Sequence, residues 1–218
     1  ILKAGLLAAS LLLLWGCGER ANYVKFEGET MGTRYHITAE LPPEVQSNVI
    51  DQLFQQRLNA INLSMSTWRD DSMITAFNNA ELGAVIAVDQ DFINVLEVSR
   101  EVYKASNGAF NPGVGTLIDL WGFGRYLTVD QLQHAPTKEA ISQAMARIRF
   151  DLVENRGLQL IKSTDIHLNF SAVAKGYAVD QLAKVLVDAG VKNYMVEIGG
   201  EISTLGKSPR GTHWRIGI

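Results

Sequence analysis

The sequence lacks most of the residues that organise small secreted domains and metalloproteins. Cys17 is the only cysteine in 218 residues, so neither an internal disulfide nor an all-cysteine metal site can organise the fold. The four histidines lie far apart, without HxxxH or HExxH spacing, and this argues against a zinc hydrolase. With 5 prolines and 19 glycines, the chain is neither collagen-like nor of low complexity.

An excess of positive charge and the common nucleotide-binding motifs are also missing. The 20 Lys+Arg are outnumbered by 23 Asp+Glu, for a net charge of −3, so no nucleic-acid partner is expected. Segment 113–116 (GVGT) matches neither GxGxxG nor GxxxxGK[ST], which excludes Rossmann and P-loop interpretations. What remains, 47% apolar and 20% charged residues, is typical of a globular domain with a sizeable core.

The one long hydrophobic run is too short to cross a membrane. Residues 4–16 carry no charge and follow Lys3, but as a helix they reach only about 20 Å, against about 30 Å for a bilayer core. That length is typical of a signal peptide, and the ending Leu14-Trp15-Gly16-Cys17 resembles a bacterial lipobox. We predict that residues 1–16 are a lipoprotein signal peptide and that Cys17 carries the lipid anchor. The alternative is that Cys17 is a buried free thiol.

The rest of the chain mixes strand-like and helix-like patterns, which predicts an α+β fold. Strands are expected at 23–29, 35–41, 84–88, 148–153, 158–162, 166–170, 194–198 and 214–218. Helices are expected at about 44–63, 72–78, 91–108, 137–147 and 172–189. Segment 109–124 is broken by glycines and predicted to be a long structured loop. Because the pattern stops abruptly at Ile218, we expect the C-terminal part of the domain to be missing.

The junction near residue 170 is the sharpest candidate for an anion site. A predicted strand ends at Asn169 and Phe170, a helix follows, and Lys175 falls in its expected first turn. A cation there opposes the helix dipole, so removing it should not lower stability, whereas a bound anion would relieve the conflict and meet the first backbone amides. Taken alone, the lysine is better explained as a surface residue with a small energetic penalty.

Six short segments, taken together and in this order, resemble the ApbE family of FAD:protein FMN transferases. They are GETMGT at 28–33, MSTW at 65–68, GAFNP at 108–112, LWGFG at 120–124, AKGYAVD at 174–180 and GGEI at 199–202. The resemblance covers about residues 23–218. It implies one ApbE-like, T-fold-like domain over residues 17–218, truncated at the C-terminus.

The resemblance also implies roles for individual residues. Met31 and Trp68 would border the flavin, and the less favoured alternative for Trp68, given its place in a polar turn, is an ordinary core aromatic. The family's other FAD contacts would fall on Ala109, Phe110, Asn111, Asn169 and Lys175. Asn169 stands where the family commonly has aspartate, so nucleotide hydrogen bonding is expected to survive there without the charge. The main-chain carbonyl of Ala172 would bind Mg²⁺. The other metal ligands and the catalytic residues are expected beyond Ile218.

The implied activity is Mg²⁺-dependent transfer of the FMN moiety of FAD to a Ser or Thr hydroxyl of a target flavoprotein, with release of AMP. The implied partners are acceptor subunits of respiratory or other extracytoplasmic redox complexes, reached from the periplasmic side of a membrane. The sequence leaves two alternatives open: an FAD-binding lipoprotein without transferase activity, and an FAD pyrophosphatase that uses water as the acceptor. It also leaves open whether the inner or the outer membrane holds the anchor.

Overall fold

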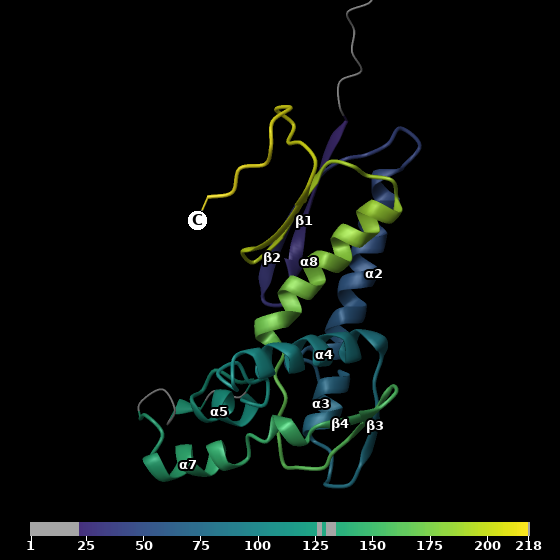
Figure 1. Cartoon of the computed structure of the whole chain (residues 1–218). Coiled ribbons are helices and arrows are strands. Elements are labelled where there is room, and N and C mark those ends of the chain that lie inside the picture. The colour runs from purple at the N-terminus through teal and green to yellow at the C-terminus, as the bar shows by residue number, and fades with distance from the viewer. Residues whose placement is uncertain (1–21, 126–127, 130–133, 218) are drawn as a thin grey trace, which may run out of the picture.

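The computed structural model describes residues 22–125, 128–129 and 134–217 (Figure 1). The predicted signal peptide and Cys17 lie outside the described residues, so the lipid anchor stays a prediction. In the part of the chain that is described, no helix combines the length and apolar character needed to cross a membrane. Helices alternate with antiparallel strand pairs, and this confirms the α+β class.

Four antiparallel strands form the larger sheet, in the order β1-β2-β6-β7. Their bounds are β1 Tyr23–Thr30, β2 Thr33–Glu40, β6 Tyr194–Ile198 and β7 Glu201–Leu205. Between β1 and β2, Met31 and Gly32 have φ angles of 50° and 72°, as a two-residue turn between twisted strands requires. The strands predicted at 23–29, 35–41 and 194–198 are confirmed.

The C-terminal end of this sheet differs from the prediction. The strand β7 was not predicted, because its five residues show no buried position and therefore no apolar alternation. The strand predicted at 214–218 is wrong in its described part, 214–217, where the backbone forms none. The strand that pairs with β6 on this side of the sheet is β7, which follows it in a hairpin.

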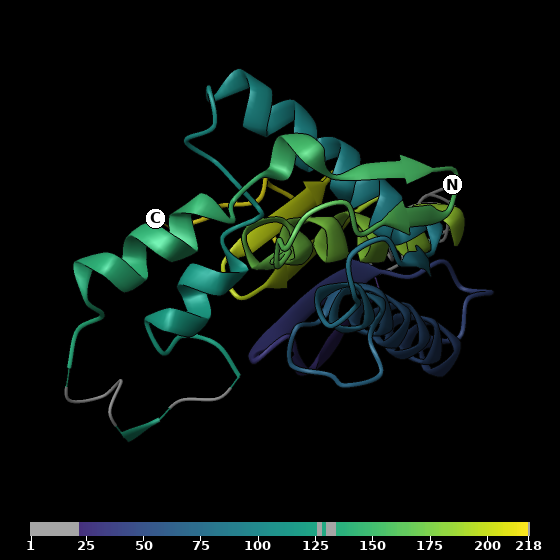
Figure 2. The same cartoon turned by 90° about the horizontal axis from the view of Figure 1, so that it is seen from below.

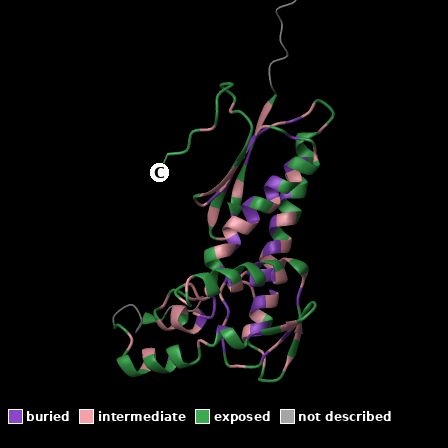
Figure 3. Ribbon diagram, viewed as in Figure 1, coloured by how far each residue is buried: buried purple, intermediate pink, exposed green. Residues whose placement is uncertain are grey.

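Two long helices pack against this sheet. The helices α2 (Ser47–Met65) and α8 (Ser171–Asp188) lie side by side, and α8 also contacts β6 and β7. Their buried positions recur at helical spacing and turn toward the sheet (Figure 3). At the centre, Phe54 of α2 meets Phe26 of β1 edge to face, with ring centroids 5.3 Å apart. Both helices were predicted to within a few residues.

Shorter elements gather at one end of the two long helices (Figures 1 and 2). The helices are α3 Met73–Asn78, α4 Gln90–Ala105, α5 Gly115–Leu120, α7 Lys138–Ala146 and the 3-10 turn η1 Phe150–Leu152. The strands β3 Val85–Ala87, β5 Gln159–Ile161 and β4 Glu154–Arg156 form a second, antiparallel sheet in that order. The predicted helices at 72–78, 91–108 and 137–147 and the strands at 84–88 and 158–162 are confirmed.

Three predictions in this region are wrong. Segment 109–124 contains the helix α5, which has six residues and is too short to show a helical period. The strand predicted at 148–153 is the 3-10 turn η1, and the chain enters β4 only at Glu154. Residues 166–170 form no strand; they make one isolated bridge, from His167 to Val114. Their other backbone groups bond to side chains and loops instead.

An ion pair ties the two long helices to α4. Arg57 of α2 donates two hydrogen bonds to the carboxylate of Asp91 of α4, and its Nη2 lies 2.6 Å from Oδ1. The hydroxyl of Tyr177 of α8 also donates to Oδ1, at 2.6 Å. The hydrogen bonds from Arg57 hold the pKa of Asp91 below its ordinary value, although burial acts in the opposite direction.

We expect Asp91→Asn to destabilise the protein in a pH-dependent way. At pH 7 the free energy of unfolding should fall by about 1.5–3 kcal/mol, the usual range for hydrogen bonds to a charged group. Because the pKa of Asp91 is lower in the folded than in the unfolded chain, its contribution is complete above the unfolded value of about 3.9 and is lost as the pH falls through the folded value. Thermal unfolding of wild type and variant between pH 7 and pH 3 measures this.

The matched control is Asp188→Asn, which removes the exposed partner of Lys184. Surface pairs of this kind contribute at most about 0.5 kcal/mol. If wild type and Asp91→Asn differ as much in stability at pH 3 as at pH 7, the paired carboxylate is not the cause of that difference.

Candidate functional site

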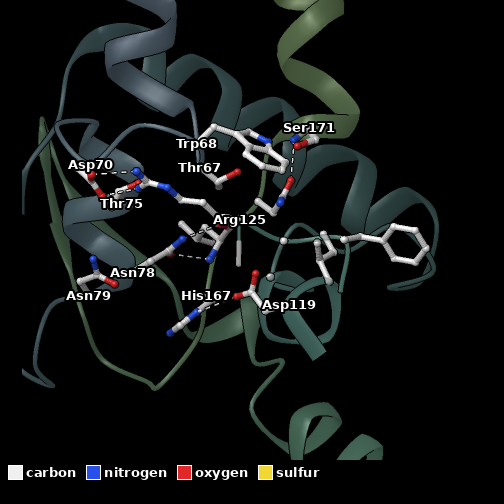
Figure 4. Close-up of a pocket in the computed structure, with 16 residues that line it drawn as sticks. Thr67, Trp68, Asp70, Thr75, Asn78, Asn79, Asp119, Arg125, His167 and Ser171 are labelled. Carbon is white, nitrogen blue, oxygen red and sulfur yellow. Dashed lines mark hydrogen bonds and ion pairs between the residues drawn. The ribbon is translucent and has the colours of Figure 1, made fainter. Parts of the chain in front are cut away.

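A cleft of about 670 Å³ opens beside the N-terminus of α8 (Figure 4). Its walls come from the turn at 67–70, from α3 and the residues after it, from α5 with the glycine-rich segment that follows, and from residues 167–171. A hollow of about 110 Å³ adjoins it and shares Thr67, Trp68 and Ser171 with it. Four of the six segments that resemble the ApbE family, those at 28–33, 65–68, 120–124 and 174–180, therefore contribute residues to the cleft or the hollow, although they are far apart in the sequence.

Trp68 lies at the junction of the cleft and the hollow. It follows the end of α2, and its backbone N–H donates to the hydroxyl of Ser66, 3.3 Å away. Its side chain is 62% exposed, which excludes the alternative of an ordinary core aromatic. An indole ring held in the open offers a flat surface for stacking. Met31, in the turn between β1 and β2, lines the same hollow.

Lys175 also lines the hollow, but its surroundings differ from the prediction. The helix begins at Ser171, so Lys175 is the fifth helical residue and does not lie in the first turn. Its Nζ is 3.0 Å from Oε1 of Glu201 and 3.4 Å from the carbonyl oxygen of Gly199. The carboxylate offsets much of the predicted conflict with the helix dipole. The side chain lines the hollow, and its ammonium is held by the hairpin of β6 and β7.

Asn169 lies in the wall of the cleft and also supports the start of α8. Its Oδ1 accepts a hydrogen bond from the backbone N–H of Ser171 at 2.9 Å. Among the described residues, the amide nitrogen of Asn169 donates to no partner, so it can donate to a ligand. The carbonyl of Phe170 accepts from the N–H groups of Val173 and Ala174. The expectation that these first amides face an anion is therefore mostly wrong, because they already have acceptors.

The three residues expected from segment 109–111 do not line the cleft. Ala109 and Phe110 donate their backbone N–H groups to Ser106, which continues the end of α4. Oδ1 of Asn111 accepts from the N–H of Gly113 at 2.9 Å. The segment is nevertheless adjacent, because the carbonyl of Pro112 accepts a 2.8 Å hydrogen bond from the N–H of Asn169. The segment therefore contacts the wall of the cleft on the side that faces away from the cleft.

The described residues do not by themselves make up a magnesium site. Ala172 is exposed at the start of α8, where its carbonyl could be one ligand. In ranges 22–125, 128–129 and 134–217, no group of three His, Cys, Asp or Glu side chains could hold a metal ion. One neutral carbonyl falls short of the oxygen-rich set that magnesium requires.

Sequence reasoning missed the charged groups of the cleft. Arg125 donates to the carboxylate of Asp70 from the opposite wall (Figure 4), and this holds the pKa of Asp70 below its ordinary value. Nδ1 of His167 lies 3.9 Å from Oδ2 of Asp119. Burial, and then the neighbouring charge of Lys162, lowers the pKa of His167. No motif spacing links these four residues, so only the folded chain could reveal them.

We expect Asn169→Asp to be tolerated and Asn169→Leu to be harmful. Aspartate keeps the acceptor for the N–H of Ser171, whereas leucine removes both the acceptor and the free amide donor. Leucine should cost about 0.5–1.5 kcal/mol of unfolding free energy, the usual net contribution of one hydrogen bond. It should also weaken FAD binding. Thermal unfolding and FAD titration measure the two effects, and equal FAD affinity in wild type and Asn169→Leu would contradict a role for this side chain in the site.

Comparison with known proteins identifies relatives of the whole described region. Residues 31–218 match the model of the ApbE family. The FAD:protein FMN transferase of Vibrio cholerae is 35% identical over 212 residues, which cover 96% of this chain and 63% of the relative. The transferase of Haemophilus influenzae is 31% identical, over 100% of this chain and 64% of the relative.

Solved structures agree with the fold. The flavin transferase ApbE from Vibrio cholerae superposes with a TM-score of 0.86 at 34% identity, over 91% of this chain and 64% of that one. The apo flavinyl transferase ApbE of Pseudomonas stutzeri gives a TM-score of 0.85 at 30% identity, over 91% of this chain and 66% of that one. The chain thus spans a little under two thirds of the length of the curated relatives that it matches.

Proposed function

Because the chain belongs to the ApbE family, we propose that the complete protein transfers the FMN moiety of FAD to a Ser or Thr hydroxyl of a target flavoprotein. The relatives named as FAD:protein FMN transferases support this activity. The observation that carries the proposal from this chain is the meeting of Trp68 and Lys175 in one hollow beside Asn169.

These three side chains suit the aromatic rings, the pyrophosphate and the ribose hydroxyls of FAD. The exposed ring of Trp68 can stack on a flat aromatic system, with a gain of about 0.5–1.5 kcal/mol beyond the area buried. The ammonium of Lys175 can neutralise the charge of the pyrophosphate. The amide nitrogen of Asn169 can donate to a ribose or phosphate oxygen. Each group comes from a different element, so the fold, and no single motif, creates the site.

The reaction requires positioning more than covalent chemistry by the protein. The acceptor hydroxyl oxygen attacks the phosphorus on the FMN side of the pyrophosphate and forms a phosphoester. The bond from that phosphorus to the bridging oxygen breaks, AMP leaves with this oxygen, and the hydroxyl proton passes to a base or to solvent. A cation at Lys175 stabilises the charge that grows on the departing phosphate.

Magnesium dependence is part of the proposal by family membership. When bound, the ion would neutralise pyrophosphate charge, and Ala172 is the one described residue that we propose as a ligand, through its carbonyl. Because the described residues do not complete a magnesium site, we assign no step of the reaction to the ion.

We propose further that the protein acts at the periplasmic side of a bacterial membrane, held there by a lipid on Cys17. The support is the hydrophobic run that ends at this cysteine. Acceptors would then be flavoprotein subunits of extracytoplasmic redox complexes. Mass spectrometry of the natural protein tests the anchor: the first residue should be an acylated Cys17, and an intact N-terminus upstream of Cys17 would contradict it.

Product analysis tests the proposed activity. The complete protein is mixed with FAD, Mg²⁺ and a candidate acceptor domain, and the products are separated. FMN bound covalently to the acceptor, together with AMP, supports the transferase. Free FMN with AMP would instead indicate a pyrophosphatase, and FAD that stays bound and unchanged would indicate a binding protein.

A further inference from the structure

Lys162 is a lysine buried almost completely behind the wall of the cleft. Its residue is 1% exposed and lies just after β5. Its Nζ donates to the carbonyl oxygen of Ile166 at 2.6 Å and to that of Asn78 at 3.2 Å. The ammonium also lies 4.6 Å from the centre of the Phe77 ring. The cation therefore joins the last residues of α3 to the segment that leads into the cleft.

Asn78 makes a second connection between the same two segments. Its side-chain nitrogen donates to the carbonyl of Leu168 at 2.9 Å, and its Oδ1 accepts from the N–H of Leu168 at 2.8 Å. The amide thus imitates one step of a β-ladder. This explains why residues 166–170 form no strand although their sequence is strand-like: a side chain takes the place of the neighbouring strand.

The two connections fix the position of Asn169. Lys162, after β5, binds the backbone of Ile166, and Asn78 of α3 binds that of Leu168. On the other side, the carbonyl of Pro112 accepts from the N–H of Asn169. Asn169 follows directly and starts α8 through its bond to Ser171. The wall of the cleft is therefore located by hydrogen bonds from two sides.

Stability alone does not explain a buried ammonium at this point. Among the described residues, no carboxylate makes an ion pair with Lys162, and burial lowers the pKa of the amine. Burying a charged group without a paired opposite charge costs free energy. A methionine would fill nearly the same space beside Phe77. What only the ammonium supplies is a directional bond to the carbonyl of Ile166.

We propose that Lys162 and Asn78 are positioning residues of the nucleotide site, which hold residues 166–169 so that Asn169 and the start of α8 meet the ligand. The inference rests on the proposed function, in that FAD is taken to occupy the cleft. Lys162 is buried outside the lining of the cleft, and Asn78 lines the cleft but uses its side-chain amide to bind the backbone of Leu168. Both act through the backbone of the segment that they anchor.

Two variants of the complete protein test the proposal. Lys162→Met removes the ammonium and keeps the stem, and Asn78→Ala removes both bonds to Leu168. We expect each variant to bind FAD about tenfold more weakly, because small misplacements of binding groups are costly. In transfer assays the KM for FAD should rise while kcat stays within about twofold. Lys184→Met, on the exposed face of α8, is the matched control and should behave as wild type.

Hydrogen exchange separates positioning from general destabilisation. In both variants the amides of Leu168 and Asn169 should exchange faster, while those in the middle of α2 keep their wild-type rates. Faster exchange throughout α2, or wild-type FAD affinity in both variants, would overturn the inference. Wild-type protein that binds no FAD would overturn the proposed function as well, so the two failures are distinguishable.

Discussion

Replacing Phe92 with alanine is expected to lower the free energy of unfolding by about 3–5 kcal/mol, the usual cost of truncating a buried phenylalanine. Phe92 is fully buried in the first turn of α4. Its ring meets that of Phe170 at a centroid distance of 5.1 Å and an angle of 75°. Because Phe170 is the residue before α8, the cavity left by this truncation would lie directly under the candidate site.

Phe123→Ala provides the matched control for this experiment. The same atoms are removed there from a side chain that is 77% exposed, and the unfolding free energy should change by no more than about 0.5 kcal/mol. Denaturant unfolding of the three proteins measures the difference. Similar losses in the two variants would show that Phe92 is not part of the core that supports the site.

Lys175→Met is expected to weaken FAD binding or transfer about ten- to a hundredfold. The variant keeps the stem of the side chain and removes only the cation. Loss of one charge-assisted contact costs about 1.5–3 kcal/mol, and this corresponds to that range of affinity or rate. FAD titration and transfer kinetics at fixed Mg²⁺ measure the effect, with Lys184→Met as the control for loss of an exposed lysine. Unchanged affinity and rate in Lys175→Met would place the pyrophosphate elsewhere.

The ion pair with Glu201 reverses the sign of the expected stability change in Lys175→Met. From the helix dipole alone, removing the lysine should leave the ligand-free protein as stable as before or more stable. The structure shows that Glu201 would lose its partner, and its other oxygen is buried without a hydrogen bond to any described residue. We therefore expect a small loss, up to about 1 kcal/mol for a partly exposed pair.

The sequence predicted those parts of the fold that rest on periodicity. The helices α2 and α8 have apolar positions at helical spacing over four turns or more, and β6 alternates buried and half-buried residues. Elements without a period were missed. The helix α5 has six residues, and β7 has no buried position, so neither produces a pattern.

The site could be predicted only in part, for a related reason. The resemblance to the ApbE family located Trp68 and Lys175 because each lies in a short recognisable segment, and it located Asn169 because that residue shortly precedes the segment at 174–180. The interactions that give these residues their geometry are non-local. Glu201 lies 26 residues after Lys175, and Asn78 lies 90 residues before Leu168. Such pairs follow from the packing of α8 and α3, and no local pattern encodes them.

A crystal structure of the complete protein with FAD tests the central claim most directly. The account predicts the flavin or the adenine stacked on Trp68, a phosphate oxygen within hydrogen-bonding distance of Nζ of Lys175, and Asn169 in contact with the nucleotide. FAD bound at another face of the protein, with the cleft and the adjoining hollow left to solvent, would contradict it.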